Sequence, residues 1–147
     1  ASVLNNNKAV ALQNRALIAY KNGLIDTANK MSWLEKAKED FLAAIAASQR
    51  TIELVGKAEA ADAQKYQADK HKAIAAIVEN QRLLIATNAD ISKPNDAVVA
   101  LDNYIAIETD PAKKSKAQVG IADALRLAGS SGEAVPIYRK VLEADPS

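Results

Sequence analysis

Hydrophobic residues recur at intervals of three and four along most of the chain, which is the spacing of an amphipathic α-helix. The pattern is sharpest in the C-terminal third, where it begins after Asp110-Pro111 and stops at Gly129. Aspartate before proline suits a helix start, and glycine suits a left-handed C-terminal cap. A second periodic stretch follows and stops at Asp145-Pro146. The pattern therefore predicts two antiparallel helices joined by a short loop.

The start of the last helix carries a capping signal and a potential helix breaker. Ser130 and Glu133 have the Ser-x-x-Glu spacing of a capping box, in which each side chain accepts a hydrogen bond from the other residue's backbone. Pro136 lies inside the same periodic stretch. If the helix starts near Gly132, Pro136 falls in its first turn and removes at most one hydrogen bond.

The N-terminal third has the same organisation. Apolar spacing predicts a helix over 4–22 that Gly23 ends, followed by a loop over 24–31. The sequence Ser32-Trp-Leu-Glu35 has capping-box spacing and precedes a helix whose apolar face extends to Ile52. We expect a second antiparallel pair here, with a longer loop than in the last pair.

The middle of the chain predicts long helices with few breaks. Residues 61–87 combine high helix propensity with an apolar stripe, residues 88–94 contain Asn, Asp, Ser and Pro, and residues 97–108 are again periodic. Gly56 is the only helix breaker between Ile52 and Ala61. The second and third helices are therefore predicted to be unusually long.

These helix–loop–helix units resemble the tetratricopeptide-repeat (TPR) family. The two Asp-Pro endings lie about one TPR period of roughly 34 residues apart. Gln118 stands where the family often has Trp, and Val141 where it usually has Ala. The residues that carry the resemblance in the last repeat are Ala122, Leu125, Gly129, Ala134, Tyr138, Val141 and Pro146.

Segments 14–23 and 37–44 resemble a divergent first repeat, and the middle repeat matches through its second helix and its Asp-Pro ending. The resemblance implies an all-α fold, with antiparallel helical hairpins stacked as a short right-handed α-solenoid. It also implies one TPR-like domain over 1–147. The approximate repeats are 5–55, 60–111 and 112–147.

Composition narrows the possible functions. The chain has 19 Lys and Arg against 18 Asp and Glu, so its formal net charge of +1 indicates neither nucleic-acid binding nor attraction to an anionic membrane. No apolar run is long enough for membrane insertion. Cysteine is absent, which leaves cytoplasm and periplasm equally suitable. The abrupt ends of the chain are those expected of a piece excised from a longer protein.

The sequence predicts no catalytic site, metal site or cofactor. His71 is the only histidine and lies in a polar stretch, so we expect a plain surface residue. The carboxylates are scattered, and the five glycines form no phosphate loop. For two further features the sequence allows two roles each. Asp123 and Arg126 suit either a surface ion pair or a ligand contact, and Trp33 either packs its loop or anchors a partner.

The TPR resemblance implies a non-catalytic scaffold that binds a protein or peptide partner across the inner faces of the first helix of each repeat. Self-association through the open edge of the C-terminal repeat is a second possibility. An oligomerising or regulatory module of a larger enzyme or envelope-assembly protein is an alternative function, and a helical bundle that binds a small ligand is a more remote one. By position, the partner-binding residues are Gln13, Leu17, Tyr20, Glu79, Arg82, Val119, Asp123 and Arg126.

Overall fold

A computed structural model describes residues 2–57, 60–87 and 93–145, and all of its regular structure over these residues is helical. The predicted all-α class is confirmed. The helices in chain order are α1 (Ser2–Ile25), the short 3₁₀ helix η1 (Thr27–Asn29), α2 (Lys30–Gly56), α3 (Ala60–Ala86), α4 (Pro94–Ile107), α5 (Pro111–Leu127) and α6 (Ser131–Ala144).

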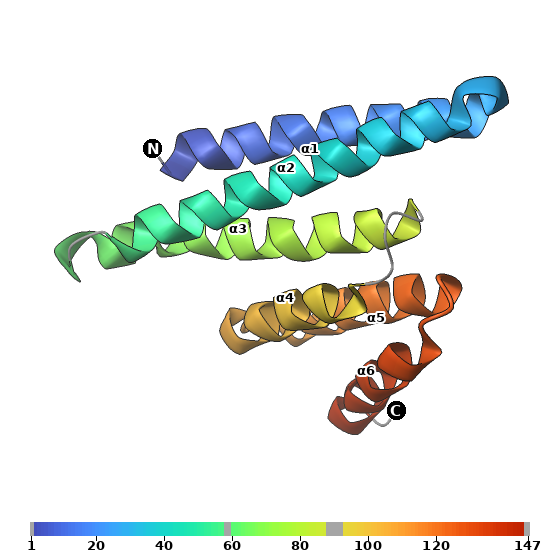
Figure 1. Ribbon diagram of the computed structural model, residues 1–147. Helices are drawn as coiled ribbons and strands as arrows, with labels where there is room; N and C mark the ends of the chain where they lie inside the picture. The colour runs from blue at the N-terminus through green and yellow to red at the C-terminus, as the bar shows by residue number, and fades with distance from the viewer. Residues whose placement is uncertain (1, 58–59, 88–92, 146–147) are drawn as a thin grey trace.

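Successive helices run in opposite directions and lie beside one another, with α1 at one edge of the molecule and α6 at the other (Figure 1). Helices α1, α3 and α5 run in the same direction and form a row, because α3 contacts both α1 and α5. Among the described residues, the backbones of α1 and α2 make no close approach to α4, α5 or α6. Helix α3 therefore joins the first hairpin to the rest of the molecule.

The predicted loop over 24–31 is wrong, because α1 continues to Ile25 and α2 begins at Lys30. Gly23 lies buried inside α1 rather than after it. A Cβ atom on Gly23 would lie 3.2 Å from the Cβ of Trp33. The glycine is needed for close contact between two helices, and its usual role as a helix terminator misled the prediction.

The predicted capping box at Ser32 is also wrong. Ser32 lies in the first turn of α2, exposed to solvent, and the helix begins after Asn29 without a side-chain cap. The connection is instead stabilised by Asp26, whose carboxylate accepts hydrogen bonds from the backbone of Asn29 at 3.3 Å and from the indole of Trp33 at 3.1 Å. Asp26 therefore stabilises the connection between α1 and α2, for which the sequence pattern had predicted a cap by Ser32.

The prediction of two long central helices is confirmed, since α2 and α3 each contain 27 residues and Gly56 is the last residue of α2. Helix α4 begins at Pro94, three residues before the predicted start at 97. Proline suits the first helical position, where its missing N–H removes no hydrogen bond. Residues 88–92 of the predicted loop lie outside the described residues.

Both predicted ends of α5 are confirmed. The Asp110 carboxylate accepts a hydrogen bond of 2.9 Å from the backbone N–H of Ala112 and so caps the helix. Gly129 has φ of 88°, the left-handed conformation expected of a C-terminal cap. The N–H of Ser130 donates to the carbonyl of Leu125 at 2.8 Å and closes the helix end. The second Asp-Pro ending includes Pro146, which lies outside the described residues.

Helix α6 follows Ser130 as predicted, but the Ser130 side chain makes no capping hydrogen bond. Because the helix begins at Ser131, Pro136 lies in its second turn rather than its first. One intrahelical hydrogen bond, to the carbonyl of Gly132, is therefore lost. The rest of the apolar face compensates for this loss by burying Ala134 and Ile137.

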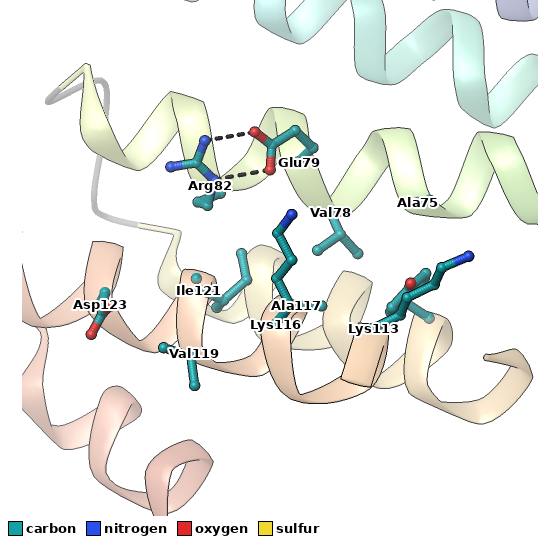
Figure 2. A pocket seen from close by; sticks show the side chains of 12 residues that line it. Ala75, Val78, Glu79, Arg82, Lys113, Lys116, Ala117, Val119, Ile121 and Asp123 are labelled. Carbon is teal, nitrogen blue, oxygen red and sulfur yellow. Dashed lines mark hydrogen bonds and ion pairs between the residues drawn. The ribbon is translucent and has the colours of Figure 1, made fainter. Parts of the chain in front are cut away.

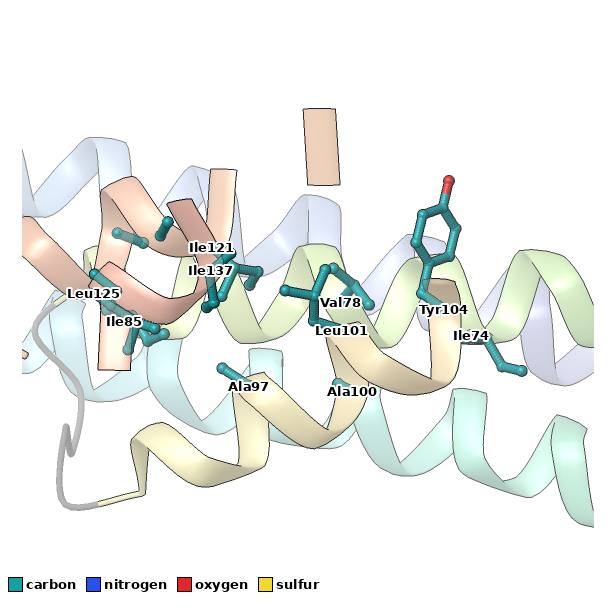
Figure 3. Close-up of a cluster of buried hydrophobic side chains, with 13 residues drawn as sticks. Ile74, Val78, Ile85, Ala97, Ala100, Leu101, Tyr104, Ile121, Leu125 and Ile137 are labelled. Atoms are coloured by element: carbon teal, nitrogen blue, oxygen red, sulfur yellow. The ribbon is translucent and has the colours of Figure 1, made fainter. Parts of the chain in front are cut away.

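Most of the buried apolar side chains of the described residues belong to two clusters of different composition. The first lies among α1, α2 and α3 and is built from small residues around one fully buried phenylalanine, Phe41. The second lies among α3, α4, α5 and α6 and contains larger aliphatic side chains (Figure 3). Its most deeply buried large members are Leu101, Ile121 and Leu125.

Candidate partner-binding groove

A groove of about 700 Å³ lies between α3 and α5, with one contribution from α4 (Figure 2). We call it the α3–α5 groove. Its floor is mostly apolar, and charged side chains stand along both rims. The residues that line it are Ala75, Val78, Glu79 and Arg82 of α3, Tyr104 of α4, and Lys113, Lys116, Ala117, Val119, Gly120, Ile121 and Asp123 of α5.

The α3 rim carries an internal ion pair. Glu79 and Arg82 lie one helical turn apart, and the guanidinium donates two hydrogen bonds to the carboxylate, at 2.6 and 2.9 Å. The hydrogen bond to Glu79 raises the pKa of Arg82 above its usual value. Both side chains are partly exposed, so the pair of hydrogen bonds between them is what mainly restricts their conformations. The Glu79 carboxylate is thus already occupied by a cation of its own helix.

Arg82 approaches α5 at a glycine. A Cβ atom on Gly120 would lie 3.2 Å from the Cδ of Arg82. Gly120 is therefore a point of close contact between the two rims of the groove, and a larger side chain there would displace Arg82.

One turn beyond Gly120 on the α5 rim, Asp123 accepts a hydrogen bond from the hydroxyl of Tyr138 on α6. This bond raises the pKa of Tyr138. Among the described residues Asp123 forms no ion pair with Arg126, so the proposed surface ion pair between them is not present. Asp123 therefore has a hydrogen-bond donor, but no cation among the described residues neutralises its charge.

Two lysines of the α5 rim have no such partner. Lys113 and Lys116 lie one turn apart and are exposed, and neither forms an ion pair among the described residues. Figure 2 shows both side chains projecting from α5 on the side that faces α3. The uncompensated charge of the α3–α5 groove is therefore positive.

One end of the groove floor rests on a polar network that the sequence did not reveal. Glu108, at the end of α4, is only 5% exposed and accepts hydrogen bonds from Tyr104 at 2.9 Å and His71 at 2.8 Å. It also accepts from the backbone N–H groups of Thr109 and Asp110, both at 3.0 Å. These bonds tie α3 and α4 to the start of α5.

The same network sets the ionisation of its members. The hydrogen bond from the Asp110 backbone, followed by those from Tyr104 and His71, lowers the pKa of Glu108 to about 2. Burial, followed by the contact with Glu108, raises the pKa of Tyr104 to about 12. The prediction of a plain surface histidine is corrected, because His71 is half-buried, bonded to Glu108 and in edge contact with the Tyr104 ring.

The structure brings together four of the eight partner-binding residues predicted from the sequence. Glu79, Arg82, Val119 and Asp123 all line the α3–α5 groove. Arg126 lies one turn beyond Asp123 on α5, exposed and outside the groove lining.

The three predicted residues of α1 lie elsewhere. Leu17 and Tyr20 pack against the small-residue cluster with α2 and α3, and Gln13 is half-buried on the same helix. They form part of the packing between the first hairpin and α3.

Sequence reasoning missed the two lysines and Tyr104. Positions 113, 116, 120 and 123 follow one face of a helix, so the spacing that selected Asp123 also selects both lysines. The contribution of Tyr104 could not be found in this way, because it depends on how α4 packs against α5.

Trp33 is partly buried and packs against the small-residue cluster, its indole N–H bonded to Asp26. Of its two proposed roles, packing the connection between α1 and α2 is the one observed.

Within the described ranges, no group of three or more His, Asp or Glu side chains is arranged to hold a metal ion. None of the helices in the same ranges has both the length and the apolar character needed to cross a bilayer. No protein-family model, curated protein sequence or solved structure matches the chain. The function is therefore argued from the α3–α5 groove.

Proposed function

We propose that this chain is a non-catalytic, TPR-like interaction scaffold that binds a segment of another protein in the α3–α5 groove. The observation that carries the proposal is the convergence of Glu79, Arg82, Val119 and Asp123 on one groove. These residues were selected by repeat position alone, on two helices separated by a third.

The arrangement of the helices supports a stacked array of hairpins. Consecutive helices are antiparallel neighbours, and α1, α3 and α5 form one row. In a closed bundle the outer helices would meet, whereas α1 and α2 make no close backbone approach to α4, α5 or α6 over the described residues. In a TPR-like solenoid, the row of first helices lines the surface that binds ligands.

The groove has the size and composition of a peptide site. A volume of about 700 Å³ accommodates several side chains, and its apolar floor with charged rims matches the anatomy of recognition surfaces. The carboxylates that line it accept hydrogen bonds from Arg82 and Tyr138, which hold them in place along the groove.

The proposal is tested by filling the groove. Val119 is half-buried in the lining, and Val119→Trp would add bulk to the groove wall, whereas Val99→Trp adds the same bulk at a 58% exposed site on α4. Quantitative affinity capture should lose its specific partners with Val119→Trp and keep them with Val99→Trp. If both variants retain wild-type helicity and the same partners as the parent, the groove is not the binding site.

Self-association is a second candidate function. Near the C-terminal edge, Leu127, Val135 and Leu142 are 77%, 44% and 65% exposed, so they are accessible to a second copy of the chain. Sedimentation velocity should show concentration-dependent assembly that Leu142→Glu abolishes. A monomer at every concentration would eliminate this candidate.

A further inference from the structure

The α3–α5 groove contains charges of both signs, but they are not equally available. Each of its two carboxylates already accepts a hydrogen bond within the protein, Glu79 from Arg82 and Asp123 from Tyr138. Lys113 and Lys116 have no ion-pair partner among the described residues. A ligand therefore meets two ammonium groups that have no ion-pair partner, against one carboxylate, that of Asp123, whose charge no cation among the described residues neutralises.

The free charges and the apolar floor lie side by side. Helices α3 and α5 run in the same direction, so Lys113 and Lys116 lie opposite Ala75 and Val78 (Figure 2). Farther along the groove, Ile121 is fully buried, and Gly120 is in contact with Arg82. A ligand that satisfies both features needs carboxylates for the two lysines and an apolar side chain beside them, over Ala75 and Val78.

We infer that the partner segment is an acidic peptide, with at least two carboxylates bound by Lys113 and Lys116 and an apolar side chain packed over Val78. This inference rests on the proposed function and specifies its ligand. An ammonium group pairs with a carboxylate at short range and attracts it from a distance, so the two lysines set both the affinity and the association rate.

A polyphosphate ligand fits the same surface less well. The apolar floor offers a phosphate backbone no favourable contact, whereas it can pack against the apolar side chains of a peptide. The formal net charge of the chain is only +1. An oligonucleotide is therefore kept as one arm of the test.

The test measures binding of fluorescent peptide pools to the whole chain. The peptides are about 12 residues long, enough to span a groove of this size at roughly 3.3 Å per extended residue. An acidic pool combines Asp and Glu with Leu and Ala, a basic pool replaces the acids by Lys, and a neutral pool replaces them by Gln. A labelled oligothymidine serves as the polyphosphate probe.

The key variant is Lys113→Glu/Lys116→Glu. Its matched control is Lys30→Glu/Lys57→Glu, which makes the same change in net charge at exposed sites at the two ends of α2. The acidic pool should bind the parent and the control equally, and the groove variant at least ~10-fold more weakly, with added salt weakening the parent complex. The basic pool and oligothymidine should bind the parent more weakly than the acidic pool.

The possible failures are distinguishable. If Val119→Trp reduces peptide binding while Lys113→Glu/Lys116→Glu does not, the groove binds a peptide and the acidic preference is wrong. Equal or tighter binding of the basic pool or of oligothymidine also overturns the inference, as does an acidic pool that does not bind the parent. If every peptide that binds is insensitive to Val119→Trp, the proposed function fails as well.

Discussion

Helix α1 meets α2 through a face of alanine and glycine, whereas α3 meets α5 through longer side chains of its own. On α1 the buried face includes Ala9, Ala16, Ala19 and Gly23, and the two helices touch along most of their length. On α3 the corresponding contacts with α5 are made by Val78 and Arg82. Small side chains let helices approach until nothing fits between them, and larger ones hold them apart and leave the groove.

The polar contacts of the two regions also differ, in the number of elements that they connect. In the first hairpin, Arg15 donates two hydrogen bonds to Asp40, at 2.6 and 2.7 Å, and this bond lowers the pKa of the aspartate. In the second half, Glu108 accepts four hydrogen bonds and connects three elements. The Arg15–Asp40 pair joins the adjacent helices α1 and α2. The Glu108 network fixes the junction of α3, α4 and α5 that supports one end of the α3–α5 groove.

The largest effect is expected at Phe41, the one large side chain of the small-residue cluster that is fully buried among the described residues. Phe41→Ala should lower the free energy of unfolding by about 3–5 kcal/mol, because alanine neighbours cannot collapse into the cavity. Urea denaturation followed by circular dichroism measures this. Leu42→Ala, at a 46% exposed neighbour, is the control and should cost less than about 1 kcal/mol. Equal losses would show that the first hairpin does not depend on this contact.

The next effect concerns Gly23. Gly23→Val should lower the free energy of unfolding by about 1–3 kcal/mol, because the added atoms meet Trp33 where α1 and α2 are closest. Trp33 is the only tryptophan, so its fluorescence reports the change at this site. Gly56→Ala, where no atom lies within 4 Å, is the comparison and should cost little or stabilise α2. A Gly23→Val variant with parental stability and emission would disprove the close contact.

At the end of α5, Gly129 serves a turn rather than a contact. Gly129→Ala should cost about 1–2 kcal/mol, because a Cβ disfavours φ of 88° even though the space around it is empty. Gly132→Ala, in the first turn of α6, should be neutral or stabilising by up to about 1 kcal/mol. Comparing the thermal unfolding of the two variants distinguishes backbone strain at Gly129 from steric crowding by an added Cβ atom. The interpretation fails if both substitutions have the same sign.

The smallest expected effect is a change of slope with pH. The pKa of Glu108 is about 2 in the folded protein against an ordinary 4.5, so the unfolded chain binds the proton first as the pH falls. The stability contributed by Glu108 is therefore complete above about pH 4.5 and is lost progressively toward pH 2. Glu108→Gln should flatten the decline in the free energy of unfolding over this range, and Tyr104→Phe should flatten it partly. An unchanged slope in Glu108→Gln would contradict the network.

Much of the local structure follows from the sequence alone. Apolar spacing predicted all six helices, and Asp110 and Gly129 marked the ends of α5 correctly. These signals are local, because capping and left-handed turns involve residues within one turn of each other. The errors at Gly23 and Ser32 arose where a local signal competed with a contact between helices.

The α3–α5 groove depends on contacts between helices, which local signals in the sequence do not specify. Repeat position selected Glu79 and Asp123 in advance, but not the fact that Arg82 and Tyr138 occupy them and leave Lys113 and Lys116 free. Helical periodicity and breakers, which the sequence alone determines, specify how long each helix is and which face it buries. Only the tertiary structure decides how closely two helices approach and which charges remain unpaired, because both depend on side chains far apart in the chain meeting across an interface.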